Sequence, residues 1–400
     1  MIDYEKVITN ENNLYEAVLK SVKNSKWKTS SQRTIVDILR FVFRLSDTLK
    51  NKEYKSNVVS AFKTYERGRL RLIDSYSVND RAVRHVLCDE IFSDKIRNKI
   101  IYDNSASIKG RGLSYARRRF EVHLHKYYNE FKTNEGYILF GDFSKFYDNI
   151  IHTFAKEQLL ELVDNDPYIS WLLDVIFEAF EVDCSHLTND EIDKLYYGVL
   201  DKLSFNFNNY NYKTKKTLKK SISIGDQLSQ LVGIYYPHEI DNYVKIVRSQ
   251  KYYRRYADDW YVISNSKDEL LDILKNIKKI ATKLGIHINE RKTRIVKLSS
   301  NYKYLQVIYS LTETGRVVKK INPKRVTTMR IKLKKLAIKV ENNEIPYEYV
   351  ENSFKSWMGS FYKLMSKDQR NNMIELYESL FNVEIEIKNS KMIIFRKEIL

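Results

Sequence analysis

The sequence predicts a mixed α+β fold divided into several domains. Apolar residues recur at helical spacing over the first 60 residues and again over the last 90. Short β-rich runs lie between these segments, and GYILFGD (136–142) and KYYRRYADDWYVIS (251–264) are the clearest of them. With 400 residues, 43% of them apolar, the chain can bury a substantial core, and its 11 Gly and 4 Pro exclude collagen-like and linker-rich classes.

The first elements follow from local patterns. Residues 1–60 are expected to be helical, because LYEAVLKSVKNS and TIVDILRFVFRLSDTLK repeat apolar residues at helical spacing. Gly68 lies between two Arg-bearing runs and predicts a β-hairpin within 64–77. A basic helix is expected over 113–130, followed by the strand 136–142, which ends in an acid.

The middle of the chain combines helical and β patterns. Residues 165–220 indicate a helical insertion that ends in the basic run KTKKTLKK. Gly225 opens a long helical pattern, GDQLSQLVGIYYPHEIDNYVKIV. Residues 251–264 then predict two strands around a tight acidic turn.

The last 90 residues indicate a separate helical unit. Asn322 is a good N-cap and Pro323 suits the first helical position. The helix that follows has one apolar stripe, and most of its other positions are Lys or Arg. Ser366 and Gln369 form a capping-box pattern before another helix, and EIEIKNSKMIIF predicts a terminal hairpin.

The net charge of +18 favours a polyanionic partner, because such a surplus attracts phosphate backbones. A solvated Lys-rich surface explains the same number. Cys88 and Cys184 are the only cysteines, which excludes a disulfide scaffold or a four-cysteine zinc site and indicates a reducing compartment. The N-terminus has no apolar signal region and no apolar run approaches about 20 residues, so we expect a cytoplasmic protein without membrane association.

Paired acids at the predicted hairpin tip carry the functional argument. Asp258 and Asp259 lie between two β-rich runs, and neighbouring carboxylates are costly unless cations neutralise them. Mg²⁺ prefers such oxygen ligands, although an isolated Asp-Asp pair is usually an ordinary turn. A second acid, Asp142, ends the strand 136–142, and two carboxylates from separate strands would suit a two-metal site. Asp148 is interpreted as a helix-start residue.

In these acids and in three further motifs, the chain resembles the reverse transcriptases. YADD and the run from Asp142 to Tyr147 look like their motifs C and A, GDQLSQ (225–230) resembles motif B, and LGIHINERKT (284–293) resembles motif D. The order and spacing of the four motifs match as well, and the resemblance covers about residues 60–310. Within the family, GDFSKFYDNI and SIGDQLSQ look most like prokaryotic defence-associated enzymes, the abortive-infection and unknown-group relatives.

The resemblance implies a metal site and a nucleotide site. Asp142 and Asp258 would hold two Mg²⁺ ions, with Asp259 as an assisting ligand and the Phe143 carbonyl completing the coordination. Lys292 would lie near the leaving pyrophosphate and donate a proton or neutralise charge.

Tyr147 occupies the steric-gate position, where a bulky ring excludes a 2′-hydroxyl and favours deoxynucleotides; a core tyrosine is the alternative. Arg69 and Arg71 match the positions that grip the triphosphate, and strand alternation places both on one face. A solvated basic face remains the alternative for them. Arg254 and Arg255, just before YADD, are candidates for contact with the primer or template backbone.

Motif B departs from the family pattern. Gly225, Ser229 and Gln230 are its expected substrate-binding residues, but Ile224 replaces the Gln usual before the glycine. Gln306 likewise stands where Gly is usual in the primer-grip segment. Both changes indicate altered handling of nucleotide or template.

The expected fold is therefore a right-hand polymerase. Its parts would be an N-terminal helical segment (1–60), fingers (61–135), an antiparallel-sheet palm with a helical insertion (136–311) and a basic helical thumb (312–400). The expected function is RNA-directed DNA synthesis by two-metal nucleotidyl transfer in antiphage defence. The partners would be dNTPs, a DNA product and an RNA template, a cognate non-coding RNA above all. Whether the chain forms a homo-oligomer is left open.

Three alternatives stay open. The first is a template-independent, protein-primed DNA polymerase of the abortive-infection type, which Ile224 favours. The second is a mobile-element or retron reverse transcriptase. The third is a non-catalytic scaffold that binds nucleic acid, against which the retained acids and Lys292 argue.

Overall fold

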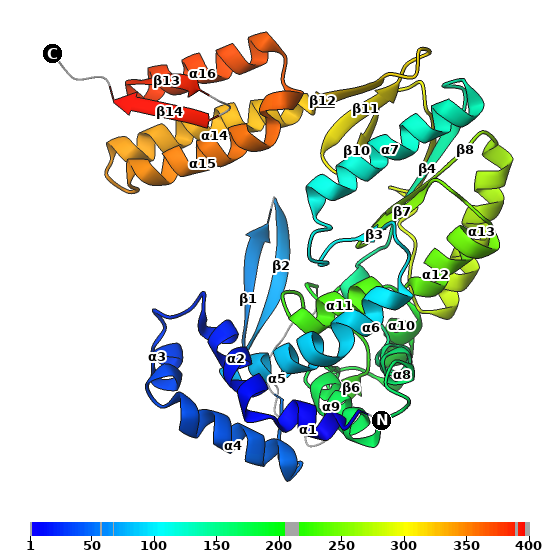
Figure 1. Ribbon diagram of the computed structural model, residues 1–400, viewed down its shortest axis with the longest axis vertical. Coiled ribbons are helices and arrows are strands. Elements are labelled where there is room, and N and C mark those ends of the chain that lie inside the picture. Colours follow the sequence, from blue (N-terminus) through cyan, green and yellow to red (C-terminus); the bar gives the residue numbers. More distant parts are fainter. Residues whose placement is uncertain (1, 57, 67, 205–215, 389–390, 397–400) are drawn as a thin grey trace. The chain divides into compact units, whose positions relative to one another are not determined.

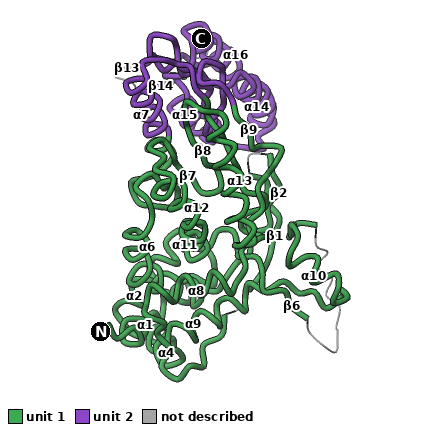
Figure 2. Tube along the Cα trace, turned by 90° about the vertical axis from the view of Figure 1, so that its right-hand side faces the viewer, with its two compact units in different colours: residues 1–116, 137–295 green, residues 117–136, 296–400 purple. Residues whose placement is uncertain are grey.

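The computed structural model describes residues 2–56, 58–66, 68–204, 216–388 and 391–396. The chain divides into two compact units, one of residues 1–116 and 137–295 and one of residues 117–136 and 296–400 (Figure 2). Helices and antiparallel sheets occur in both units, which confirms the predicted α+β class (Figure 1). Among the described residues, no helix combines the length and the apolar character that crossing a bilayer requires.

The first unit begins with helices, as the periodicity predicts. These are α1 (Tyr4–Thr9), α2 (Glu11–Val22), α3 (Thr29–Val36) and α4 (Ile38–Lys50). The hairpin predicted around Gly68 is confirmed by the antiparallel pair β1 (Val58–Glu66) and β2 (Arg69–Tyr76). Three helical segments follow: α5 (Val78–Val86), the π-helix η1 (Leu87–Phe92) and α6 (Ser93–Lys99).

A five-stranded sheet of order β3-β7-β8-β4-β9 forms the centre of this unit. Its strands are β3 (Asn104–Ser105), β4 (Tyr137–Asp142), β7 (Tyr253–Tyr256), β8 (Asp259–Ser264) and β9 (Arg294–Lys297). The predicted strand 136–142 and the predicted hairpin 251–264 are therefore both confirmed. β8 pairs antiparallel with β4 on one side and with β7 on the other, so it is an interior strand, and five of its six residues are buried. The amphipathic helix α13 (Lys267–Lys283) contributes Leu270, Ile273 and Ile277 to the same core.

The segment between β4 and β7 differs in part from the sequence prediction. The insertion contains the helices α9 (Pro167–Glu178) and α10 (Asn189–Tyr197), together with a small sheet of β5 (Val182–Asp183) and β6 (Thr217–Leu218); residues 205–215 lie outside the described part. The 3₁₀-helix η2 (Phe146–Asn149) and α8 (His152–Glu161) precede it. The long helix predicted from Gly225 is wrong, because it is divided into α11 (Gln227–Tyr235), α12 (His238–Asn242) and the π-helix η3 (Tyr243–Val247). Pro237, between the first two, has no N–H to continue the ladder.

The second unit contains a three-stranded sheet, three long helices and a terminal hairpin. Its elements are β10 (Tyr302–Tyr304), β11 (Val307–Leu311), β12 (Val317–Ile321), α14 (Pro323–Glu341), α15 (Tyr347–Phe361), the 3₁₀-helix η4 (Tyr362–Leu364), α16 (Lys367–Phe381), β13 (Val383–Lys388) and β14 (Lys391–Arg396). The helix α7 (Leu113–Phe131) begins in the first unit and continues in the second. The predicted N-cap, capping box and terminal hairpin are confirmed. The Asn322 side chain accepts from the Lys324 amide, and the side chains of Ser366 and Gln369 each accept a hydrogen bond from the backbone amide of the other residue. β13 pairs antiparallel with β14.

Candidate active site

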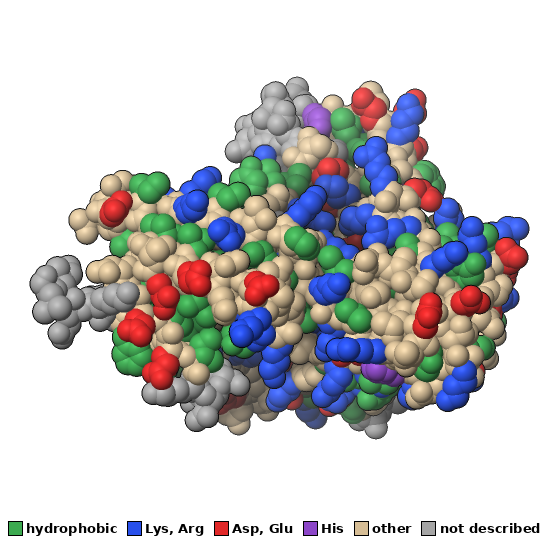
Figure 3. Space-filling model, turned by 90° about the horizontal axis from the view of Figure 1, so that it is seen from above, with side chains coloured by type: hydrophobic (Ala, Val, Ile, Leu, Met, Phe, Trp, Pro, Cys, Tyr) green, Lys and Arg blue, Asp and Glu red, His purple; other side chains and the backbone are tan. Residues whose placement is uncertain are grey.

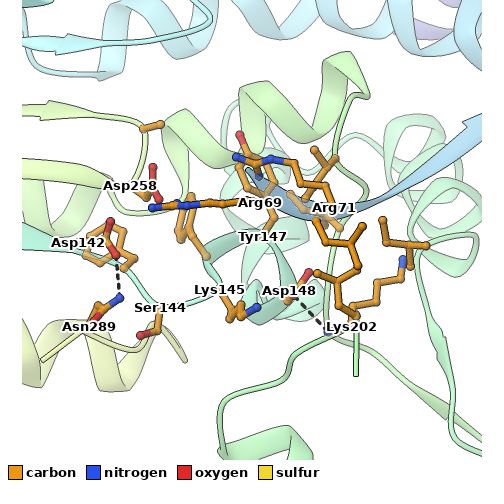
Figure 4. A pocket seen from close by; sticks show the side chains of 18 of the residues that line it. Arg69, Arg71, Asp142, Ser144, Lys145, Tyr147, Asp148, Lys202, Asp258 and Asn289 are labelled. Atoms are coloured by element: carbon orange, nitrogen blue, oxygen red, sulfur yellow. Dashed lines mark hydrogen bonds between the residues drawn. The ribbon is translucent and has the colours of Figure 1, made fainter. Parts of the chain in front are cut away.

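The structure brings the three predicted acids, Asp142, Asp258 and Asp259, to one end of the central sheet. Asp142 ends β4 and lies opposite Asp259, the first residue of β8. Asp258 lies in the two-residue turn that joins β7 to β8, and its carbonyl accepts a hydrogen bond from the Phe143 amide at 3.3 Å. Because paired strands end side by side, carboxylates far apart in the sequence meet here. Figure 4 shows the side chains of Asp142 and Asp258 close together at one side of a cavity.

Asp142 is the most tightly held of these acids. Its side chain is buried, and both of its carboxylate oxygens accept from the Lys292 ammonium at 2.7 Å. The Asn289 side chain donates to the same carboxylate at 3.1 Å, and the Asn289 amide donates to the Asp142 carbonyl at 2.8 Å. Lys292 was predicted from the motif, whereas Asn289 was missed, although it lies in the same segment three residues earlier.

The three acids repel one another in this setting. Burial, reinforced by the charge of Asp142, raises the pKa of Asp258. Burial together with the charges of Asp258 and Asp142 raises the pKa of Asp259 to about 7. Lys292 opposes both shifts, and Arg69 opposes that of Asp258, so the site favours additional positive charge.

The oxygen atoms at this end of the sheet are of the type that binds a hard divalent cation. Carboxylate and carbonyl oxygens are the ligands that Mg²⁺ prefers, and Asp142 and Asp258 both line the cavity. Asp259 does not line it, and the Phe143 ring packs in the core against Phe146 and Trp260. Within the described part of the chain, no three His, Cys, Asp or Glu side chains converge closely enough to hold an ion by themselves. Asp142 and Asp258 are therefore the residues that would hold a cation here.

The cavity has a volume of about 690 Å³ and is formed by residues from several parts of the first unit (Figure 4). Asp142 and Asp258 lie at one side, and Arg71, Asp148 and Lys202 lie at the other, with Tyr147 of η2 between the two groups. Its polar and charged lining consists of Arg69, Arg71, Asp74, Asp142, Ser144, Lys145, Tyr147, Asp148, Lys202, Asp258, Asn289 and Lys292. Such a mixture of cations and acids suits a polyanion that is bound together with a metal ion.

Arg69 and Arg71 alternate along β2, so both project from one face of the hairpin. Both line the cavity, and their contact with a triphosphate remains a prediction. The Arg71 guanidinium also forms an ion pair with Glu66 of β1 at 2.7 Å.

Tyr147 lies on the floor of the cavity in η2. Its ring is half-buried, and burial raises the pKa of its hydroxyl to about 12, so the side chain is neutral. A Cβ atom at Gly233 of α11 would lie only 2.9 Å from that hydroxyl, so the ring can occupy this position only because residue 233 has no side chain. The position of the ring agrees with a sugar-contacting role, which remains a prediction.

Asp148, interpreted as a helix-start residue, lies in the first turn of the 3₁₀-helix η2 but caps neither η2 nor α8. The next helix, α8, begins at His152 with Ile151 at its N-cap position. The Asp148 carboxylate instead accepts from the Lys202 amide at 3.2 Å and lines the cavity (Figure 4). Lys202 itself forms an ion pair with Asp74 at 2.8 Å. Sequence spacing could not reveal these contacts, because the three residues come from β2, η2 and the insertion.

The motif B residues are not brought into the cavity. Gly225 has a φ of +99°, and Ser229 is fully buried, with its amide 3.3 Å from the carboxylate of Asp226, the N-cap of α11. Gln230 is half-buried, and none of the three lines the cavity, whereas Ile224 does. Their predicted contact with substrate remains a prediction.

The predicted backbone contact of Arg254 and Arg255 is wrong. Both side chains are fully buried on β7, which is an interior strand between β3 and β8. Arg255 pairs with Asp241 at 2.7 Å, and Arg254 contacts Ser105 and the ring of Tyr115. Neither guanidinium is available to a phosphate.

The surface charge does not by itself mark the site. Figure 3 shows Lys and Arg side chains spread over the viewed face, with Asp and Glu side chains among them. The site is therefore defined by the cavity and its residues rather than by the net charge of +18.

Comparison with known proteins places the chain in a family. No curated protein matches it. Among solved structures, telomerase from Candida albicans in complex with a TWJ fragment of telomeric RNA is similar at 14% identity and a TM-score of 0.42, covering 86% of this chain and 65% of that one. Apo telomerase from Candida tropicalis has the same identity and TM-score, with 84% and 67% covered. The chain thus spans slightly less than two thirds of the first of these proteins. The family model described as reverse transcriptase (RNA-dependent DNA polymerase) matches residues 52–309, more than half of the chain, and the chain belongs to that family.

Proposed function

We propose that this chain extends a DNA strand on an RNA template by two-metal nucleotidyl transfer. The observation that carries the proposal is the cavity in which Asp142 and Asp258 meet at one side while Arg69 and Arg71 enter from β2. Acids that bind cations, next to cations that bind phosphates, suit the triphosphate of a nucleotide bound with Mg²⁺. Membership of the reverse transcriptase family supports deoxynucleotides as substrates and RNA as template.

Each residue has a defined task in this proposal. Two Mg²⁺ ions, when bound, would activate the attacking hydroxyl and neutralise charge on the phosphates. Asp142 and Asp258 would hold them, assisted by Asp259 and the Phe143 carbonyl. Arg69 and Arg71 would orient the triphosphate, and Lys292 would donate a proton or a positive charge to the leaving pyrophosphate.

The sugar and the base would meet the floor of the cavity. Tyr147 would exclude the 2′-hydroxyl of a ribonucleotide by contact with its ring. Gly225, Ser229 and Gln230 would act from the α11 side, as the motif resemblance implies.

The biological setting belongs to the proposal as well. The likeness to defence-associated enzymes supports a cytoplasmic role in antiphage defence, with a dedicated non-coding RNA as template. The division into fingers, palm and thumb at residues 61, 136 and 312 is part of the same interpretation.

Untemplated synthesis is the second candidate, and one observation favours it. Ile224 lines the cavity at the position where the family usually has Gln. An aliphatic side chain there cannot form the hydrogen bond that an amide would make to the incoming nucleotide.

A polymerisation assay with product sequencing tests both candidates. Purified protein with its co-purifying RNA receives Mg²⁺ and dNTPs, beside an RNase-treated sample and the Asp258→Ala variant. DNA complementary to a defined RNA, lost on RNase treatment, supports templated synthesis, and random or homopolymeric DNA that survives RNase supports the second candidate. No product from the wild type, with Asp258→Ala still active in cells, would refute the polymerase proposal and favour a nucleic-acid-binding scaffold.

A further inference from the structure

The turn that carries Asp258 has an unusual backbone. Ala257, the first of its two residues, has a φ of +52°, a region that hairpin turns usually fill with glycine or asparagine. A residue with a side chain keeps such a conformation only where its surroundings hold it there. Whatever holds Ala257 therefore also fixes the direction of the next residue, Asp258, which lines the cavity beside Asp142.

Arg255 supplies one of the two bonds that hold Ala257. Its Nη1 donates to the Ala257 carbonyl at 3.0 Å, while the Ala257 amide donates to the Ser105 carbonyl at 3.3 Å. The guanidinium cannot swing away, because its other nitrogens donate to Asp241 at 2.7–3.2 Å and to the Ile234 carbonyl at 2.6 Å. Its planar fork thus joins the turn to two other parts of the fold.

Asp241 is itself anchored. Both Arg255 and Asp241 are completely buried. The Tyr253 hydroxyl donates to Asp241 at 2.6 Å and the Asn104 amide group donates at 3.2 Å. The network therefore connects β3, β7, α11 and α12 with the tip of the hairpin.

Stability alone does not account for this arrangement. A fully buried ion pair gives little net stability over an apolar pair of similar volume, because both charges lose their hydration. What this pair provides in addition is a rigid donor at the Ala257 carbonyl. Hydrogen bonds to the backbone next to a ligand orient that ligand and govern how well a site binds metal.

We propose that Arg255, held by Asp241, is a positioning residue that fixes the Ala257–Asp258 turn so that the Asp258 carboxylate faces Asp142 in the geometry for binding divalent cations. The inference rests on the proposed function, because that function assigns Asp258 to cation binding.

The first test compares two neighbouring arginines. Arg255→Lys keeps the charge but loses the fork that reaches Asp241, Ile234 and Ala257 together. Arg254→Lys is the matched control, since Arg254 is equally buried on the same strand but donates to the side-chain oxygen of Ser105, whereas Arg255 donates to the Ala257 carbonyl itself. Mn²⁺ binding without nucleotide is measured by electron paramagnetic resonance, beside polymerisation rate and thermal unfolding. We expect Arg255→Lys to weaken Mn²⁺ binding about 10–100-fold, and Arg254→Lys to bind as the wild type does.

The second test separates positioning from folding. The double variant Arg255→Met/Asp241→Asn removes both charges together, so no buried charge is left unpaired, and the amide oxygen that replaces the carboxylate can still accept from Tyr253. We expect its Tm to lie above that of Asp241→Asn alone, which leaves the buried Arg255 charge unpaired, while Mn²⁺ binding falls as in Arg255→Lys. If both variants bind Mn²⁺ as tightly as Arg254→Lys does, the positioning role is refuted while the proposed function stands. A wild type that neither binds Mn²⁺ nor makes DNA would refute the proposed function itself.

Discussion

Replacing Gly233 by alanine tests whether Tyr147 contacts the substrate, without changing any residue that lines the cavity. The new Cβ would lie 2.9 Å from the Tyr147 hydroxyl oxygen and 3.1 Å from the ring carbon that carries it. Ordinary contact needs about 3.5 Å, so the end of the ring must move by about 0.6 Å. Tyr147 lines the cavity, so we expect the ring to move towards the space proposed for the sugar.

The expected effect is larger on catalysis than on stability. Alanine favours a helix interior over glycine by about 1 kcal/mol, which offsets part of the overpacking cost of about 1–3 kcal/mol. A displacement of about 1 Å can cost a factor of about 100 in rate, so we expect kcat/KM for a dNTP to fall about tenfold for Gly233→Ala. Single-nucleotide incorporation kinetics measure this, with thermal unfolding in parallel.

Two further variants make the result specific. Gly359→Ala is the control for helix propensity, because a Cβ at Gly359 in α15 meets no atom within 4 Å; it should leave kcat/KM unchanged. Tyr147→Phe removes the hydroxyl, which is the nearest clashing atom. In a Tyr147→Phe background, Gly233→Ala should therefore lower kcat/KM much less than it does in the wild type. Unchanged kinetics in Gly233→Ala, or a loss that Tyr147→Phe does not relieve, would refute the placement of Tyr147 in the nucleotide site.

Three other predictions concern charge and capping. The pKa of Asp259 is raised to about 7, so the folded protein favours the protonated carboxyl; the resulting stabilisation is complete below about pH 4 and is lost as the pH rises towards 7. Asp259→Asn should therefore raise the Tm of the metal-free protein at pH 8 but not at pH 4, as measured by differential scanning fluorimetry in EDTA, and equal shifts at both pH values would contradict this. Arg71→Ala should raise the KM for dNTPs about tenfold or more, since a charge-assisted phosphate contact is lost, while Arg33→Ala on the exposed face of α3 should not; equal effects would contradict a triphosphate contact. Ser366→Ala removes the N-cap of α16 and should lower the free energy of unfolding by about 1 kcal/mol in urea titrations, and no change would mean that solvent replaces the cap.

Local signals predicted the part of the site that depends on local structure. The β-rich runs on both sides of Ala257 and Asp258 define a hairpin from the sequence, and the strand before Asp142 is equally plain. The four ordered motifs then predicted the enzyme class, which the match to the reverse transcriptase family confirms. The interruption of the predicted helix at Pro237 could also have been predicted from the sequence, because proline within a helical pattern usually ends the helix.

The rest of the cavity depends on contacts across long stretches of sequence. Asp74, Asp148 and Lys202 meet through an ion pair and a backbone hydrogen bond, yet more than 50 residues separate each from the next. Sequence periodicity does not predict contacts over such distances. One lysine among the many of a basic protein is also not distinctive by itself. Asn289 differs, because its place three residues before Lys292 could have suggested a shared role.

Arg254 and Arg255 show why charge patterns mislead at strands. Two adjacent arginines in a chain of net charge +18 suggest an exposed basic patch, and alternation would expose at least one of them at an edge strand. On β7, however, both side chains are fully buried, so both faces of the sheet are covered at these positions. A buried arginine must find acceptors, and Arg255 finds them in Asp241 and in the Ala257 carbonyl of the turn that carries Asp258. The basic residue that the sequence assigned to the nucleic acid is thereby turned inwards, where it can act on the substrate only through the geometry of Asp258.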